Sequence, residues 1–360
     1  MIKLEHVSFS YQAGEADKAA RVLCDVSFQA SPGECVVLCG KSGCGKTTML
    51  RLVNGLAPHF YAGKLAGSVS VCGLDVPRIP LSRTAQAVGS VFQNPRAQFF
   101  HLDTTGEMAF NLENQNVPRP EMRERLKEVV SRLDLQELMD RNIFELSGGE
   151  KQQIACGSVY ASLPPVIVMD EPSSNLDMES IRKLKKLIRI MKNEGKTVLI
   201  SEHRLWYLEG IADRYVLLER GRIREELSPE AAGSLSAEQR KALGLRAISR
   251  EQLYASQPVG TLPPRGETGL EIDGLQFSRQ MRQVLHVPHL AIPKGAVVAV
   301  IGENGAGKST LSLCLAGLLK HSAQYASTEK RSPIKSCRSR STWSCRRRDI
   351  SCSATPCWAN

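Results

Sequence analysis

The sequence predicts an α/β protein built around a phosphate-binding loop. Three observations carry this prediction: an apolar run over residues 35–39, a glycine-rich motif over 40–48 directly after it, and a second apolar run over 166–169 that ends in two carboxylates. Buried parallel strands read as short continuous apolar runs, and open α/β sheets bind ligands at the carboxyl ends of such strands. We therefore expect a sheet whose strand ends carry a nucleotide site.

The motif at 40–48 reads G-K-S-G-C-G-K-T-T and fits the pattern G-x-x-x-x-G-K-[ST]. Its glycines let the backbone turn tightly and bring N–H groups up to phosphate oxygens. Lys46 is placed to reach the β- and γ-phosphates, and the Thr47 hydroxyl to ligate Mg²⁺. The helical segment 49–56 adds the positive end of its dipole. The motif by itself predicts a nucleoside triphosphate and Mg²⁺.

Length and composition bound the class of protein. The 360 residues leave room for two domains, and a hydrophobic content of 42% is ordinary for a globular chain. No apolar run approaches the roughly 18 residues of a membrane span, and the N-terminus has no secretory apolar region. We expect a cytosolic chain whose membrane role, if any, is peripheral. The 11 cysteines show no C-x-x-C pair and are expected to stay reduced.

The net charge of +10 is concentrated at one end of the chain. Residues 320–360 hold nine Lys/Arg and two acidic residues, so the rest of the chain carries a net charge of only +3. A nearly neutral body argues against a nucleic-acid partner.

The N-terminal segment predicts a small antiparallel subdomain. Residues 2–11 alternate apolar and polar side chains, and 22–28 fit a partner strand. Tyr11 either lays its ring on a base or packs locally at the strand edge. Further strands are expected at 68–71 and at 87–93, where Gln93 could reach a metal ion or its water.

Residues 94–147 change to helical patterns, such as 119–139, and predict an inserted helical subdomain. The motif L-S-G-G-E-K-Q follows at 146–152. Its Ser147, Gly148 and Gly149 at a helix N-terminus form a second candidate anion site.

The segment V-I-V-M-D-E-P at 166–172 predicts a buried strand with its carboxylates at the carboxyl end. Asp170 is placed to hold Mg²⁺ through water, and Glu171 to polarise an attacking water. The turn S-S-N-L-D, an amphipathic helix over 181–191 and a strand over 197–200 follow. His203 comes just past that strand, where a third group could meet the terminal phosphate, and 215–223 predict a closing hairpin.

Taken together, these motifs occur in the order found in ABC-type ATPases, which residues 1 to about 225 resemble. The resemblance implies the phosphate-loop NTPase fold of that family: a mixed sheet core, an antiparallel β-subdomain and an inserted helical subdomain. It implies ATP and Mg²⁺ as cofactors. Gln93, Glu171 and His203 would be catalytic, with Glu171 as the general base, and Thr47, Gln93 and Asp170 would serve Mg²⁺. The implied ATP-binding residues are Tyr11, Gly40, Lys41, Ser42, Gly43, Cys44, Gly45, Lys46, Thr47, Thr48, Ser147, Gly148 and Gly149.

In this family two ATPase domains pair head to tail, so Ser147 and Gly149 would contact the ATP of the partner domain. The stretches V-F-Q-N-P-R-A-Q-F-F and S-E-H-R-L are similar to the ATPases of energy-coupling-factor importers. These importers take up vitamins or ions such as cobalt and nickel. The resemblance thus implies integral membrane transport subunits as partners and a peripheral position at the cytoplasmic face of the membrane.

A second copy of the loop follows a predicted linker at 226–268. Residues 27–59 align without gaps on 289–321, with ten of 33 positions identical. We expect 269–321 to be the first part of a second ATPase domain. Arg279 replaces the equivalent of Tyr11 there. The predicted ATP-binding residues of this copy are Gly302, Glu303, Asn304, Gly305, Ala306, Gly307, Lys308, Ser309 and Thr310.

After His321 the globular pattern ends. Residues 322–360 contain nine serines, four cysteines and no glycine. They read either as a low-complexity basic tail or, in the interpretation we favour, as a segment translated in a shifted reading frame. We expect the tail to be disordered and residues 289–321 to pack poorly or act as a stub. ATP hydrolysis would then need two copies of the first domain from different chains.

Two other interpretations stay open. One is a soluble tandem ABC ATPase that acts on ribosomes or in DNA repair, although the basic body or long coiled-coil insertion expected there is not seen in the sequence. The other is a non-functional truncated remnant.

Overall fold

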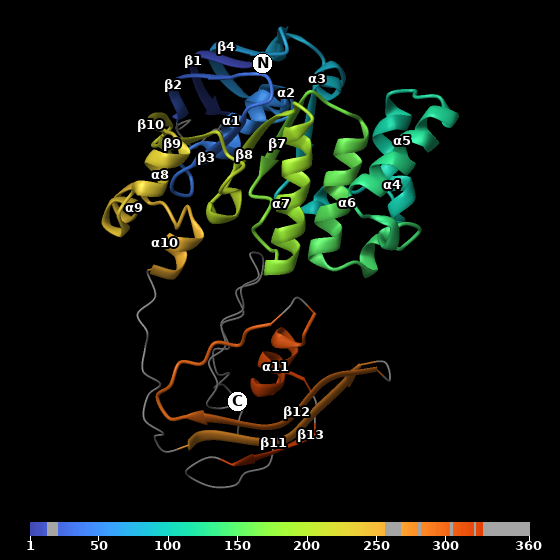
Figure 1. Ribbon diagram of the computed structural model, residues 1–360, viewed down its shortest axis with the longest axis vertical. Coiled ribbons are helices and arrows are strands. Elements are labelled where there is room, and N and C mark those ends of the chain that lie inside the picture. The colour runs from blue at the N-terminus through green and yellow to red at the C-terminus, as the bar shows by residue number, and fades with distance from the viewer. Residues whose placement is uncertain (13–20, 256–267, 280–281, 303–304, 320–321, 327–360) are drawn as a thin grey trace, which may run out of the picture. The chain divides into compact units, whose positions relative to one another are not determined.

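A computed structural model describes residues 1–12, 21–255, 268–279, 282–302, 305–319 and 322–326. The chain divides into two units, Met1–Gln257 and Pro258–Asn360, whose elements are labelled in Figure 1. In the part of the chain that is described, no helix combines the length and the apolar character needed to cross a membrane.

The first unit is centred on a six-stranded sheet with the order β10-β9-β3-β8-β7-β6. Its strands pair in parallel, except for the antiparallel hairpin of β9 and β10. All five residues of β3 are buried, as its continuous apolar run predicts. The strands are β3 (Cys35–Cys39), β6 (Val88–Val91), β7 (Val166–Asp170), β8 (Thr197–Ser201), β9 (Arg214–Glu219) and β10 (Arg222–Leu227). The predicted strand positions and the closing hairpin are confirmed.

A four-stranded antiparallel sheet with the order β2-β1-β4-β5 forms the predicted subdomain. Ile2 of β1 lies opposite Ala30 of β2 and opposite Val71 of β4. The strands are β1 (Ile2–Tyr11), β2 (Arg21–Ala30), β4 (Gly63–Val71) and β5 (Leu74–Asp75).

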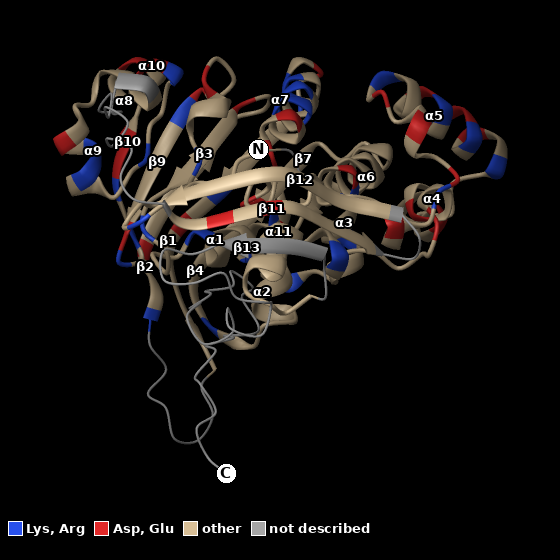
Figure 2. Cartoon of the chain, turned by 90° about the horizontal axis from the view of Figure 1, so that it is seen from below, with Lys and Arg blue, Asp and Glu red and all other residues tan. Residues whose placement is uncertain are grey.

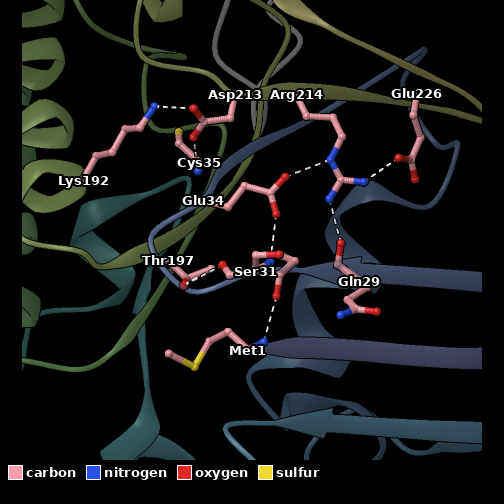
Figure 3. Close-up of polar contacts among 11 residues, drawn as sticks. Met1, Gln29, Ser31, Glu34, Cys35, Lys192, Thr197, Asp213, Arg214 and Glu226 are labelled. Atoms are coloured by element: carbon pink, nitrogen blue, oxygen red, sulfur yellow. Dashed lines mark hydrogen bonds and ion pairs between the residues drawn. The ribbon is translucent and has the colours of Figure 1, made fainter.

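Arg214, at the start of β9, joins the two sheets (Figure 3). Its Nε donates to Oε1 of Glu34 at 2.9 Å, and its terminal nitrogen donates to the backbone oxygen of Gln29 on β2 at 2.6 Å. Next to it, Asp213 accepts a 2.8 Å hydrogen bond from the backbone N–H of Cys35. These contacts fix the start of β3 and therefore the direction in which the chain enters the phosphate loop.

Helices pack on the central sheet. In Figure 1, α6 lies between α7 and α4, and it contacts both. The helices are α1 (Lys46–Val53), α2 (Leu56–His59), α3 (Leu81–Ala87), α4 (Thr104–Asn114), α5 (Arg119–Arg132), α6 (Gly148–Ala161) and α7 (Met178–Asn193). Short 3₁₀ turns occupy Val76–Arg78, Pro95–Ala97, Gln136–Leu138, Ile143–Glu145 and Trp206–Leu208.

The helical subdomain is confirmed by α4 and α5, but one predicted helix is shorter than expected. The pattern over 119–139 predicted one continuous helix, whereas α5 ends at Arg132 and a 3₁₀ turn follows. Asp134 between them adopts a left-handed backbone conformation with φ of 54°, which a continuing helix excludes. Figure 2 shows basic and acidic residues side by side on α5, so this helix offers no one-signed surface to nucleic acid.

Residues 229–255 of the predicted linker hold three short helices and pack on the first unit, so this part is not a linker between units. Here α8 (Pro229–Ser234), α9 (Ala237–Leu243) and α10 (Arg250–Ala255) belong to the first unit. Ala232 and Ile248 are buried in the core cluster of that unit. This segment has too few apolar residues to form a core of its own. Those residues are instead buried against the core of the first unit.

The second unit contains a three-stranded sheet with the order β12-β11-β13. Its elements are β11 (Thr268–Arg279), β12 (Arg282–Pro293), α11 (Lys308–Leu315) and β13 (Ser322–Ala326). β13 pairs antiparallel with β11, so the first five residues of the predicted tail add a strand to this sheet. The rest of the predicted tail, 327–360, lies outside the described residues.

Residues 297–301 correspond to β3 at the repeat offset, but they form no strand. The side chains of Val297 and Ile301 are 101% and 89% exposed. In the first unit β8 and β9 flank the equivalent residues, and no described strand of the second unit takes those two places. Poor packing is thus found where no described strand flanks residues 297–301, whereas β11, β12 and α11 form a small core of Ile272, Leu275, Leu285 and Cys314.

Candidate functional site

The loop 40–48 runs from β3 into α1 in a conformation that requires glycine at two positions. Gly40 has φ of 132° and Gly45 has φ of 112°, a region closed to most side chains. A Cβ atom on Gly40 would lie 2.3 Å from the backbone oxygen of Leu218, and one on Gly45 would lie 2.6 Å from a methyl carbon of Leu23. Both glycines therefore let the loop close against its neighbours.

Lys46 places an ammonium group inside this loop. Its side chain is buried, and Nζ donates to the backbone oxygens of Gly40 at 3.0 Å and of Lys41 at 3.1 Å. A buried ammonium needs such acceptors, and phosphate oxygens offer it stronger, charged ones. The loop thus presents a cation and a helix N-terminus to an anion.

Thr47 and Asp170 meet across the site. The Thr47 hydroxyl donates to Oδ1 of Asp170 at 3.2 Å. Burial raises the pKa of the Asp170 carboxyl, and the charge of Glu171 adds to this rise, while the Thr47 hydrogen bond opposes it. Hydroxyl and carboxylate oxygens are the hard ligands that Mg²⁺ prefers, and a divalent cation would offset the cost of the buried charge. These residues fit Mg²⁺.

Glu171 lies between the other two predicted catalytic residues. One carboxylate oxygen accepts a 2.7 Å hydrogen bond from Nε2 of Gln93, and the other lies 3.3 Å from Nε2 of His203. Its backbone is left-handed, with φ of 43°, and its N–H donates to the backbone oxygen of Ser201 at 2.8 Å. Strained backbone of this kind persists where surrounding contacts hold it, and it gathers at functional sites. Three residues from three strand ends therefore converge.

The motif at 146–152 forms the start of α6. Ser147 caps the helix: its hydroxyl accepts from the N–H of Glu150 at 3.3 Å, and the Glu150 carboxylate accepts from the Ser147 N–H at 2.7 Å. A Cβ on Gly149 would lie 2.0 Å from the hydroxyl of Ser180 on α7. Among the described residues no hydrogen bond joins 147–149 to the loop 40–48, so within one chain these two anion sites are separate.

Comparison with known proteins decides the family. A profile of the ABC transporter family matches residues 23–174 and 285–353, which is more than half of the chain. The chain belongs to the ABC transporter family. The phosphate loop, Gln93 and Glu171 lie within the first matched range.

Relatives of the chain carry matching names. An ABC transporter ATP-binding protein of Treponema denticola is 41% identical over 327 residues, which cover 90% of this chain and 66% of that protein. The HMP/thiamine import ATP-binding protein YkoD of Bacillus subtilis is 33% identical, over 89% of this chain and 62% of its own length. The chain thus spans slightly less than two thirds of these relatives.

Solved structures with the same fold confirm the predicted phosphate-loop NTPase architecture. The structure of cbiO1 from Clostridium perfringens, part of the complex cbiONQ, has a TM-score of 0.56 and 25% identity over 64% of this chain and 88% of its own. A dimeric structure of the ATP-binding cassette MJ0796 bound to ADP and Pi has the same TM-score and identity, over 64% of this chain and 99% of its own.

Tyr11 is attached to α1 rather than free at the strand edge. Its hydroxyl lies 3.0 Å from that of Thr48 and accepts a 3.0 Å hydrogen bond from Arg51. Its ring packs edge-on against Phe9, with centroids 5.0 Å apart. Local packing is therefore present, and a role in base stacking stays a prediction. The Thr48 hydroxyl is thus hydrogen-bonded to Tyr11, and its role in phosphate binding stays a prediction.

The second ABC phosphate loop repeats the backbone of the first. Gly302 and Gly307 have φ of 150° and 88°, and Nζ of Lys308 donates to the Gly302 oxygen at 2.8 Å, as Lys46 does to Gly40. The predicted residues Gly305 and Ala306 lie between Gly302 and α11, Ser309 and Thr310 lie in the first turn of α11, and Glu303 and Asn304 lie outside the described residues.

Two functional candidates were missed from the sequence. Arg51 lies over the ring of Tyr61, 3.9 Å from its centroid, and holds Tyr11. Glu202 is buried beside His203. The sequence feature that could have identified Glu202 is an acidic residue directly after an apolar strand, within the S-E-H-R stretch.

Proposed function

We propose that this chain is the ATP-binding and ATP-hydrolysing subunit of an importer that takes up a vitamin or a metal ion through integral membrane partners. The observation that carries the proposal is the contact of Glu171 with both Gln93 and His203, next to a formed phosphate loop. Support for import comes from the relative named for HMP/thiamine import and from cbiO1, part of a transporter complex. The chain would act at the cytoplasmic face of the membrane.

In this proposal Lys46 binds the β- and γ-phosphates of ATP. Thr47, Asp170 and Gln93 hold Mg²⁺, which neutralises phosphate charge when bound. Glu171 accepts the proton of the attacking water. Gln93 and His203 orient this carboxylate, and His203 also contacts the γ-phosphate.

The capped start of α6 then serves a second molecule. Ser147 and Gly149 would contact ATP held by the phosphate loop of another chain, because they have no hydrogen bond to the loop of their own chain. The MJ0796 neighbour is dimeric. We infer that the phosphate loop of one first domain pairs with the Ser147 segment of another first domain.

An apolar patch fits a membrane subunit. Phe100, Leu102 and Phe144 of the helical subdomain are 74%, 68% and 74% exposed, and Phe100 stacks on Phe110 with centroids 4.7 Å apart. Exposed aromatic clusters mark protein contacts. This patch follows the loop that begins at Gln93, so a helix docked on it could report on the nucleotide site.

ATPase measurements on the full chain test the proposal. Glu171→Gln should lower turnover by about a hundredfold or more while ATP still binds. Glu179→Gln, a surface change on α7, is the matched control and should retain native turnover. If two domains pair, the rate per chain rises with protein concentration, whereas strict proportionality at all concentrations would argue against pairing. Recovery with membranes rather than ribosomes separates import from the soluble alternative.

The shifted reading frame after His321 is also a proposal. The family profile runs on to residue 353, past the predicted break, so the match by itself does not mark one. The nucleotide sequence decides: codons of residues 325–358 that cannot encode ABC-like sequence in a neighbouring frame would refute the idea.

A further inference from the structure

We propose that Glu202 is a positioning residue that locks the loop carrying His203 to the turn after Glu171. This inference rests on the roles proposed above for Glu171 and His203. The two segments follow different strands, β8 and β7, and 3.3 Å separate the two functional groups. The Glu202 side chain connects one segment to the other.

The Glu202 carboxylate is buried, with 2% of the residue exposed, and accepts four hydrogen bonds. Oε1 receives the N–H of Ser173 at 3.1 Å and the hydroxyl of Tyr207 at 3.1 Å. Oε2 receives the N–H groups of His203 at 2.6 Å and Arg204 at 3.0 Å. Burying a carboxylate without hydrogen-bond partners would cost several kcal/mol. The four donors offset this cost and make Glu202 a stable junction between the two segments.

Arg204 also connects the His203 loop to the turn after Glu171. Its guanidinium donates to the backbone oxygens of Ser173 at 3.3 Å and of Leu176 at 3.1 Å. Glu202 and Arg204, on either side of His203, thus both form hydrogen bonds to the turn after Glu171. That turn begins at Glu171, whose backbone oxygen accepts the N–H of Ser174 at 3.1 Å. Any shift of the turn therefore changes the distance between Glu171 and His203.

The junction needs a carboxylate, because all four partners donate. In Glu202→Gln, the amide NH₂ must face one pair of donors. It will face Ser173 and Tyr207, since the Tyr207 hydroxyl can reverse and accept, whereas the two N–H groups of His203 and Arg204 cannot. The Ser173 N–H then loses its acceptor. The amide therefore weakens the attachment of the turn at Ser173 and leaves the His203 loop held.

The test compares Glu202→Gln with Tyr207→Phe in the full chain. Tyr207→Phe removes one donor but leaves the contacts to Ser173, His203 and Arg204, so turnover should stay native. Glu202→Gln should lower kcat about tenfold, equal to ~1.4 kcal/mol, with an unchanged KM for ATP. Combined with His203→Ala, it should add no further loss, because Glu202 acts through the Glu171–His203 contact.

Hydrogen exchange gives a readout that does not need turnover. Amides of 173–177 should exchange faster in Glu202→Gln and at the native rate in Tyr207→Phe. Unchanged exchange, or an equal loss of kcat with and without His203, overturns the inference. If instead Glu171→Gln and His203→Ala keep native turnover, the proposed function fails. The hydrogen-exchange comparison then remains as the test of whether Glu202 holds the turn.

Discussion

The Nε2 atom of His203 lies 3.3 Å from Oε1 of Glu171, although the two residues are 32 positions apart in the chain. The contact joins the imidazole to one carboxylate oxygen. It also restrains one carboxylate oxygen, while Gln93 restrains the other at 2.7 Å. An oriented carboxylate at a strand end is what water activation requires.

Two adjacent threonines should differ in their effect on metal dependence. The Thr47 hydroxyl bonds Asp170, whereas the Thr48 hydroxyl bonds Tyr11. Thr47→Val should raise the Mg²⁺ concentration for half-maximal ATPase activity by about tenfold or more, because it removes an oxygen ligand. Thr48→Val should leave that concentration within about twofold. A Mg²⁺ titration of both variants measures this, and equal shifts would remove Thr47 from the metal site.

Asp170→Asn should stabilise the metal-free chain at neutral pH while abolishing ATPase activity. Burial raises the pKa of Asp170 in the folded state, so the ionised carboxylate opposes folding above that raised pKa. The cost disappears as the pH falls through the folded and then the unfolded pKa, where both states are protonated. Urea unfolding at several pH values should show a gain that fades toward acid. Asp75→Asn is the surface control, and a gain at acid pH only would contradict the argument.

Arg214→Met should loosen the connection between the two sheets. It removes the hydrogen bond to the Gln29 backbone and ion pairs with Glu34 and Glu226. We expect a loss of about 2 kcal/mol in the free energy of unfolding. Arg182→Ala, which breaks an exposed pair within α7, should change it by less than about 0.5 kcal/mol. Urea denaturation compares them, and equal effects would show that the joint is unimportant.

Phe100 and Phe144 should matter for membrane partners and not for nucleotide chemistry. Changing both to Ser should lower recovery of the chain with membranes severalfold and leave basal ATPase activity within about twofold, because both rings are exposed. Phe60→Ser is matched in exposure, at 71%, and lies outside the patch. Loss of membrane recovery in all variants alike would refute a specific docking surface.

The exposed residues of the second unit should promote association. Changing Val297 and Ile301 to Lys should reduce light scattering of the full chain and leave its unfolding free energy within about 0.5 kcal/mol, because neither side chain is buried. Val37→Lys, at a 0% exposed position of β3, should cost several kcal/mol. A large loss of stability in the Val297 and Ile301 variant would show that this segment is packed.

Much of the fold could be predicted from short apolar runs. β3, β7 and β8 are continuous apolar segments because both faces of a central parallel strand are buried. The predicted linker failed because α8 to α10 contribute only scattered apolar residues, such as Ala232 and Ile248, to a core formed elsewhere. The end of α5 at Arg132 was not predicted, because the helical sequence pattern continues past Asp134, whose backbone is left-handed.

The sequence by itself determined the chemistry of this protein. The loop at 40–48 and the Asp-Glu pair after β7 are local features, because backbone turns and strand ends depend on neighbours in the chain. Only the tertiary structure decided which groups meet. Gln93, Glu171 and His203 converge because parallel strands end at one edge of the sheet, and Glu202 joins two loops because burial forces its carboxylate to find four donors. Such contacts depend on the packing of distant segments, which no local pattern records.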